Sequence, residues 1–207
     1  MSRLLALCLA GLVACANVPD YDDPRLIPDD DGGGDVVTCT NLLVNGAFDT
    51  TPVGWTFNPG DIVKDERQLP TDHPFYASSG DYFAWFGGSY NQTKIASQKI
   101  TVPNTAKLKL TGKYFVAAVT TAGNMEDTVK LEIVDDAGKL LTFVTGFSNL
   151  DSVSETATFL WKDLHTEIPS QPFATKAVTF RITSVNDAMN NTNFLFDSLE
   201  LKPTGCL

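Results

Sequence analysis

The residues best suited to do chemistry in this chain are carboxylates and thiols that lie far apart in the sequence. Asp197 and Cys206 lie in or after the apolar run 193–201, whereas Asp49 and Cys39 lie near the start of the folded part. Two carboxylates that neighbouring strands bring together repel each other unless a cation lies between them. Two cysteines at the ends of an exported domain favour a disulfide, with two free thiols as the alternative.

Residues that could support catalysis are few and scattered. The chain contains two histidines, His73 and His165, and neither a His-Glu-x-x-His nor a Gly-x-Ser-x-Gly stretch. Adjacent acidic residues such as Glu126 and Asp127 point to opposite faces of a strand, whereas glycoside hydrolysis needs two carboxylates that converge on one cleft. We therefore predict that the protein is not an enzyme.

Aromatic side chains are the best candidates for ligand contacts. Their rings could stack on the apolar faces of sugars while neighbouring polar groups bind the hydroxyls. Phe75, Tyr76 and Tyr90 lie in turn-rich stretches, so we expect them to be exposed, and Trp161 is a fourth candidate. These four residues form the predicted ligand-binding set.

The N-terminus has the features of an export signal. Arg3 precedes an unbroken apolar run from Leu4 to Val13, which is too short to span a bilayer and has the length of a signal-peptide core. The run leads into Leu-Val-Ala-Cys15, which resembles the lipobox of bacterial lipoproteins. This resemblance implies a signal peptide at residues 1–14, a diacylglycerol thioether and an N-acyl chain such as palmitate on Cys15, and firm anchoring. The alternative is an ordinary secretory signal with a cysteine there by chance.

Residues 15–38 are predicted to form a disordered tether between the lipid and the folded part. Seven Asp and a single Arg give residues 16–38 a charge of −6, and Pro and Gly are frequent, so the segment cannot bury enough apolar surface to order itself. Ala16, and not Asp, follows Cys15, so nothing resembles the inner-membrane retention signal of enteric bacteria. We therefore predict a lipid-anchored protein of the outer membrane or the cell surface.

The charge of the whole chain limits its partners. The net charge is −10 at pH 7 and the sequence pI is about 4.5. Nucleic-acid phosphates and anionic lipid surfaces would be repelled, so neither is an expected partner. Contact with a membrane is expected only through the N-terminal lipid.

Residues 39–207 are predicted to form one β-domain. Polar and apolar residues alternate in 107–114, 128–133 and 178–183, as they do in half-buried antiparallel strands. The chain can reverse at Gly138, and no stretch of useful length has a helical period. We therefore predict an all-β fold, an antiparallel β-sandwich. Further strands are expected at about 42–48, 54–57, 82–86, 94–102, 139–146, 154–162 and 193–201.

The predicted last strand changes its pattern partway along. Phe194 and Phe196 share one face, whereas Leu199 and Leu201 share the other, so a bulge or bend is required between them. A bulge there would re-aim Asp197, as a ligand position requires. The alternative is a kinked edge with a solvated carboxylate.

Several short motifs resemble those of jelly-roll carbohydrate-binding modules attached to cellulases and xylanases. The Ala-Trp-x-Gly-Gly stretch and residues 127–133 also resemble MAM-type jelly rolls of bacterial surface proteins. The resemblance covers nearly all of residues 41–201 and implies a jelly-roll sandwich of the galactose-binding-like type. The motifs are Asn41-Leu-Leu-Val-Asn-Gly-Ala-Phe-Asp49 followed by Gly54-Trp55, Ser79-Gly-Asp-Tyr-Phe-Ala-Trp-Phe-Gly-Gly88, Gln98-Lys-Ile-Thr-Val-Pro103 and Phe194-Leu-Phe-Asp-Ser-Leu-Glu-Leu201.

The resemblance also implies a structural Ca²⁺ at the edge of the sandwich, between the first and last strands. The matching positions are Asp49 and Asp197, with Gly80 or Asp81 contributing from a turn. Asp49 stands where the family often has Glu, whose side chain reaches farther. The alternative is two separate, solvated carboxylates.

Taken with the lipobox, the resemblance implies a non-catalytic lipoprotein of the cell envelope that binds a polysaccharide or glycan. Its landmarks also place Trp55 and Trp85 in the core. The alternative is a module for adhesion or protein–protein interaction at the outer membrane surface, in which the faces or edges of the sandwich contact another surface protein.

Overall fold

The computed structural model describes residues 40–49, 53–71, 74–118, 123–154, 158–189 and 191–204, which all belong to the unit Val37–Leu207. The predicted signal peptide and tether lie outside the described residues, as do Cys15, Cys39 and Cys206, so lipidation and the disulfide stay predictions. Among the described residues, no helix has the length and apolar character needed to cross a membrane.

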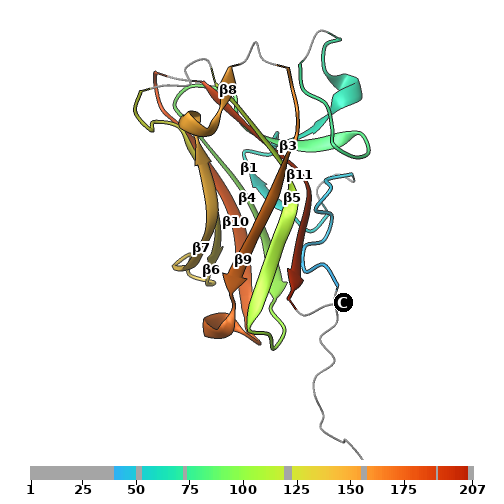
Figure 1. Cartoon of the computed structure of the whole chain (residues 1–207), viewed down its shortest axis with the longest axis vertical. Helices are drawn as coiled ribbons and strands as arrows, with labels where there is room; N and C mark the ends of the chain where they lie inside the picture. Colours follow the sequence, from blue (N-terminus) through green and yellow to red (C-terminus); the bar gives the residue numbers. More distant parts are fainter. Residues whose placement is uncertain are drawn as a thin grey trace, which may run out of the picture. The chain divides into compact units, whose positions relative to one another are not determined.

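Two β-sheets that pack face to face make up the described fold (Figure 1). Paired strands run antiparallel, apart from the short parallel contact between β5 and β8, which confirms the predicted antiparallel β-sandwich. The five-stranded sheet has the order β1 (Thr56–Asn58), β4 (Gln92–Thr101), β10 (Ala177–Asn186), β6 (Thr128–Val134) and β7 (Leu140–Ser148). The six-stranded sheet has the order β2 (Val63–Asp65), β3 (Tyr82–Gly87), β11 (Thr192–Pro203), β5 (Lys107–Ala118) and β8 (Val153–Ser154), with β9 (Lys162–Pro169) also on β5. The described residues also include the short 3-10 helices η2 (Glu66–Gln68), η3 (Asn149–Asp151) and η4 (Gln171–Phe173).

Apolar side chains from both sheets fill the space between them. Phe180 and Ile182 of β10 face this core from one sheet, and Phe194 and Phe196 of β11 face it from the other. Successive side chains of a strand point to opposite faces, so the polar residues that alternate with those of β10 point outward. In β11 the residue between the two phenylalanines is Leu195, which is buried on the other face of the sheet. Burial of these apolar side chains is the main favourable term in folding.

Residues 42–48 do not form the predicted strand. Asn45 and Phe48 have φ angles of 54° and 59°, so the chain turns repeatedly where a strand was expected. The segment nevertheless lies beside the last strand, since the backbone N–H of Leu42 donates to the carbonyl oxygen of Leu201 at 2.8 Å. The two ends of the described region are therefore neighbours in space, as the sequence analysis expects.

The region after β7 also differs from the prediction of one strand over residues 154–162. Among the described residues of that range, only Ser154 at the end of β8 and Lys162 at the start of β9 are in strands, and β9 continues to Pro169. The aromatic residues Phe159 and Trp161 lie before β9 and pack on the outer face of the six-stranded sheet. Strand β2, with only three residues, was not predicted because so short a segment carries no periodic signal.

The predicted bulge in the last strand is present. Asp197 of β11 pairs with Lys113 of β5, and the next pair is Glu200 with Thr111, so β11 has gained a residue relative to its partner. Ser198 inside the bulge has a φ of 53°. The apolar side chains before and after the bulge therefore both reach the core, and Asp197 is turned aside.

Candidate functional site

The Asp197 carboxylate binds backbone N–H groups of a turn that is distant in sequence. Its Oδ2 accepts hydrogen bonds from the N–H of Ser78 at 2.7 Å and of Ser79 at 3.0 Å, and its Oδ1 accepts one from the N–H of Ser198. Burial raises the pKa of the Asp197 carboxyl to about 6, because the loss of hydration outweighs the opposing effect of these donors. The side chain thus ties the bulge of β11 to the turn at residues 78–80.

Asp49 lies against the same turn. Its Oδ1 occupies the place that a Cβ on Gly80 would need, and Gly80 has a φ of 61°, so this position requires glycine. The structure therefore brings Asp49, Gly80 and Asp197 together. The side chain of Asp81 does not join them, since its Oδ2 lies 3.0 Å from Nη1 of Arg67.

The two carboxylates beside this turn suit part of a calcium site. Ca²⁺ binds about six to eight oxygens, so backbone carbonyls and water must supply the remaining ligands. A hollow of about 380 Å³ borders Asp49 and Ser198 and is also lined by residues 45–47. Across the described ranges, no group of three or more His, Cys, Asp or Glu could hold a metal. The chain therefore offers a site that relies on backbone oxygens, and calcium binding there stays a proposal.

Part of the outer face of the six-stranded sheet is buried under aromatic side chains. Phe83 of β3 and Phe115 of β5 point away from the core between the sheets. Phe75 and Phe159, from two loops, lie on them with ring centroids 6.0 Å and 4.5 Å from that of Phe115. We call this surface the covered face. Its buried residues are Phe75, Phe83, Phe115, Ala117, Phe159 and Leu195.

The four aromatic residues predicted to bind a ligand separate into two places. Tyr76 and Trp161 lie together at the outside of the covered face, where Nε1 of Trp161 donates to the carbonyl oxygen of Tyr76 at 3.0 Å. Tyr90 lies in the turn between β3 and β4 and is exposed, as expected. Phe75 is only 8% exposed, so the expectation of an exposed ring is wrong there. The residues around Phe75 do form irregular backbone, but its ring folds back because burying it on Phe115 is favourable.

The two tryptophans assigned to the core by resemblance also differ from each other. Trp55 does lie in the core between the sheets, as expected. Trp85 is half-buried on the covered face instead, where its Nε1 donates to Oδ1 of Asn193 at 2.9 Å.

The outer face of the five-stranded sheet carries a row of polar side chains that ends in an aromatic ring. Glu132 of β6 is the register partner of both Arg181 of β10 and Phe143 of β7, so the three side chains lie side by side. Nη2 of Arg181 donates to Oε2 of Glu132 at 2.8 Å, and Phe143 is 54% exposed. We call this set the open row. In order across the sheet its members are Thr56, Ser97, Arg181, Glu132 and Phe143.

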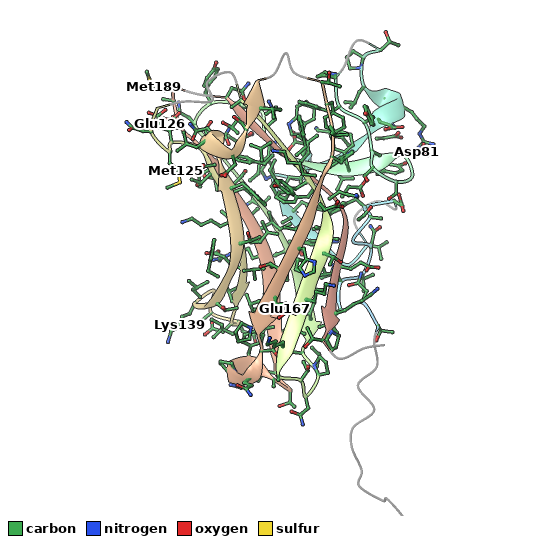
Figure 2. All side chains as sticks on the ribbon, in the orientation of Figure 1. Asp81, Met125, Glu126, Lys139, Glu167 and Met189 are labelled. Atoms are coloured by element: carbon green, nitrogen blue, oxygen red, sulfur yellow. The ribbon has the colours of Figure 1, made fainter. Side chains whose placement is uncertain are left out.

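The neighbouring backbone supports the open row. Ring atoms of Phe143 lie 3.2 Å from the place of a Cβ on Gly146, so a side chain at position 146 would displace the ring. The β6–β7 hairpin borders the row, because Asp136 near its tip lies 2.8 Å from Nζ of Lys99 on β4. Figure 2 shows Lys139 at this tip, at the far end of the hairpin from Met125 and Glu126.

The sequence analysis missed Glu132, Arg181 and Phe143. Each stands at an outward position of an alternating strand or its edge, where solvated side chains are the usual finding. Their alignment depends on strand register, including a shift between Leu131 and Glu132 that hydrophobic alternation does not reveal. Of these three residues, only Phe143 gave a usable signal in the sequence, because it is an aromatic residue at an outward position of a strand.

Comparison with known proteins identifies similar folds. No protein family and no curated protein matches the sequence. Among solved structures, the chain is similar to TmCBM61 in complex with β-1,4-galactotriose, with a TM-score of 0.48 and 19% identity over 79% of this chain and 99% of that chain. It is also similar to the CBM22-1 xylan-binding domain of Paenibacillus barcinonensis Xyn10C, with a TM-score of 0.47 and 16% identity over 82% and 97% of the two chains. A third neighbour is a family 16 carbohydrate-binding module, with a TM-score of 0.45 and 20% identity over 78% and 99%.

Proposed function

We propose that this protein is a non-catalytic binding protein that holds a neutral polysaccharide or glycan on the outer face of its five-stranded sheet. The observation that carries the proposal is the open row, in which an exposed phenyl ring, a carboxylate and a guanidinium lie in register on adjacent strands. The fold class of the structure neighbours agrees with this reading.

The chemistry of the open row matches that of a sugar. The Phe143 ring offers a flat apolar surface for the C–H face of a pyranose. Glu132 can accept hydrogen bonds from hydroxyl groups, and Arg181 can donate to them. Because the two charges are paired at 2.8 Å, the row has little net charge and favours a neutral ligand.

The size of the row favours a chain over a single sugar. Phe143 and Arg181 stand two strands apart, which corresponds to about 10 Å at the usual strand spacing. The full row crosses all five strands. A ligand that contacts both ends must therefore contain several sugar rings.

The open row also argues against hydrolysis of the bound chain. Hydrolysis of a glycosidic bond uses two carboxylates on opposite sides of that bond. The row contains a single carboxylate, and Arg181 binds one of its oxygens. We therefore assign binding, and not cleavage, to this face.

The proposal is tested by affinity electrophoresis of the full chain in gels that contain β-1,4-galactan, xylan or mixed-linkage β-glucan. We expect retardation by at least one polysaccharide and its loss in Phe143→Ala, because the stacking surface is removed. Tyr90→Ala is the matched control, since Tyr90 is as exposed as Phe143 but lies in a turn away from the row. Retardation that survives Phe143→Ala would place binding elsewhere.

Contact with another surface protein is the second candidate function. Leu140, Leu141 and Phe143 are exposed on β7, which is an edge strand, and apolar edges of this kind can receive a partner strand. Capture of a protein ligand that Phe143→Ala abolishes, with no polysaccharide retardation, would favour this alternative.

Anchoring of the protein to the outer membrane or cell surface through a lipid on Cys15 is part of the proposed function. The lipobox Leu12 to Cys15 supports it. Cys15→Ser should move the protein from the membrane fraction to the soluble fraction. Continued membrane retention of the variant would contradict lipidation.

The proposed disulfide joins Cys39 to Cys206. The hydrogen bond between Leu42 and Leu201 supports it, because it brings together the segments that lead to the two cysteines. Mass spectrometry of non-reduced peptides should recover the two cysteines in one linked species. Two thiols that can be alkylated without reduction would refute the bond.

Calcium at Asp49 and Asp197 is proposed to stabilise the domain, and not to take part in sugar binding. The contact of both carboxylates with the turn at residues 78–80 supports it, since Asp197 accepts from Ser78 and Ser79 and Asp49 lies against Gly80. Adding a chelator should lower the thermal midpoint, and excess Ca²⁺ should restore it. An unchanged midpoint would show that the carboxylates do not need the ion.

A further inference from the structure

A second hollow lies at one edge of the sandwich, on a different surface from the open row. Its volume is about 400 Å³, and it is bordered by the edge strands β1 and β2 of the two sheets. Thr56 of the open row and Phe57 of the hollow are neighbours in β1, and their side chains point to opposite faces. The residues that line the hollow are Trp55, Phe57, Gly60, Val63, Asp65, Gln68 and Tyr82.

One wall of the hollow is aromatic and fixed. The rings of Trp55 and Phe57 are stacked, with centroids 6.3 Å apart and an interplanar angle of 16°. The indole cannot turn freely, because its Nε1 donates to the carbonyl oxygen of Asn45 at 3.1 Å. Phe57 and Val63 are half-buried, so they leave apolar surface for a ligand.

The polar rim of the hollow is held by a network of hydrogen bonds. Nε and Nη2 of Arg67 each donate to the Asp65 carboxylate at 2.8 Å, and Nε2 of Gln68 donates to it at 3.0 Å. Nη2 of Arg67 also donates to the hydroxyl oxygen of Tyr82 at 3.1 Å. These contacts fix the direction of the rim groups before any ligand arrives.

The charges of this rim decide which ligands can enter. The hydrogen-bonded guanidinium of Arg67 lowers the pKa of the Asp65 carboxyl to about 2, so Asp65 stays ionised at neutral pH. Arg67 is shared between Asp65 and Asp81, which leaves one negative charge in excess. Acidic sugars and phosphates are therefore disfavoured, whereas neutral hydroxyl groups can bind.

We infer that this hollow binds a single neutral sugar residue, such as the terminal residue of a glycan chain. The inference rests on the proposed glycan-binding function but uses a different surface. An aromatic wall with a fixed polar rim is the usual arrangement for a small polar ring, and a volume of about 400 Å³ lies near the lower end of the range for ligand sites. The open row leads to β1, the strand that borders the hollow, so a chain on the row would reach this edge with its end.

Gly60 offers a way to block the hollow without disturbing the fold. A Cβ at this position meets no atom within 4 Å, and its φ lies outside the left-handed region. Gly60→Trp should therefore fold normally and reduce the free volume, and Gly60→Ala is the matched control. Gln68→Ala is a second, milder variant that removes a rim group which is exposed.

The experiment measures binding of methyl β-D-galactopyranoside, methyl β-D-xylopyranoside and methyl β-D-glucopyranoside to the full chain by ligand-detected NMR. We expect at least one glycoside to bind, Gly60→Trp to weaken it by about tenfold or more, and the matched control Gly60→Ala to leave it within about twofold. Gln68→Ala should weaken it by about threefold. A wild-type chain that binds none of the probes, or Gly60→Trp and Gln68→Ala variants that bind as wild type does, overturns the inference.

The results also separate this inference from the proposed function. Polysaccharide retardation that Phe143→Ala abolishes, with no binding of the methyl glycosides, supports the proposed function and contradicts sugar binding in the hollow. Glycoside binding that Gly60→Trp abolishes, with no retardation by any polysaccharide, supports sugar binding in the hollow and contradicts polysaccharide binding on the open row.

Discussion

The two outer faces of this sandwich use aromatic residues in opposite ways. On the covered face, Phe75 and Phe159 lie on Phe115, and only the outermost members, such as Tyr76, reach solvent. On the open row, a single phenyl ring is exposed beside an ion pair. The covered face therefore adds a second apolar core to the domain, whereas the open row leaves its one ring free to contact a ligand.

This difference teaches that abundance of aromatic residues is a poor guide to a binding surface. The sequence is richest in candidate rings where loops return over a sheet, and those rings bury each other. A ring that cannot be buried, because its strand is at the edge and its cross-strand partner is charged, is the better candidate. Phe143 meets both conditions.

The largest expected effect comes from breaking the covered face. Phe75→Ala should lower the free energy of unfolding by about 3–5 kcal/mol, because it leaves a cavity above Phe115. Denaturant unfolding measures the loss, and polysaccharide retardation of the remaining folded protein should be unchanged. If Phe75 instead contacts a ligand, retardation is lost with little change in stability.

A smaller effect is expected from the ion pair of the open row. Glu132→Gln should weaken polysaccharide binding by about 1.5–3 kcal/mol, because a charged acceptor and the position of Arg181 are both lost. Gel retardation at graded polysaccharide concentrations gives the change. Asp163→Asn breaks the ion pair with Lys113 on the other sheet and serves as control, with no expected change in binding.

The pH dependence of stability should differ between the wild type and a variant of Asp197, which lies in β11 of the six-stranded sheet. With its pKa raised from 3.8 to about 6, Asp197 stays protonated in the folded state at pH values where the unfolded chain ionises it. In the presence of chelator, stability should therefore fall as pH rises from about 4 to about 6.

Asp197→Asn provides the comparison for this pH dependence. The variant has no titrating group at position 197, so its thermal midpoint should fall less over the same pH range. Parallel curves for the two proteins would contradict the raised pKa. Saturating Ca²⁺ should flatten the wild-type curve if the proposed ion stabilises the carboxylate.

The smallest expected effect is that of Tyr76→Ala. Tyr76 packs edge-on against Phe159 with centroids 4.5 Å apart, but about half of its surface is exposed, so we expect a loss of about 1 kcal/mol or less in stability. Polysaccharide binding should be retained. Loss of binding would move the site to the covered face, beside which Tyr76 and Trp161 of the predicted ligand-binding set lie.

The sequence predicts the framework of this molecule well because its signals are local. Alternation in β5, β6 and β10 marks their buried faces, and the change of face after Phe196 marks the bulge. The burial of Phe75 and the alignment of Glu132 with Phe143 are not local, since they depend on loop packing and on strand register. These long-range features decide where the candidate binding face lies.

The pairing of the first described segment with the last strand has a mechanical consequence. The N–H of Leu42 donates to the carbonyl oxygen of Leu201, and the N–H of Leu199 donates to that of Gly46. Any force that enters the domain at residue 40 is therefore passed to β11, which has β3 on one side and β5 on the other. A pull applied at residue 40 would therefore load the middle of the six-stranded sheet, where β11 has a ladder of hydrogen bonds on each side.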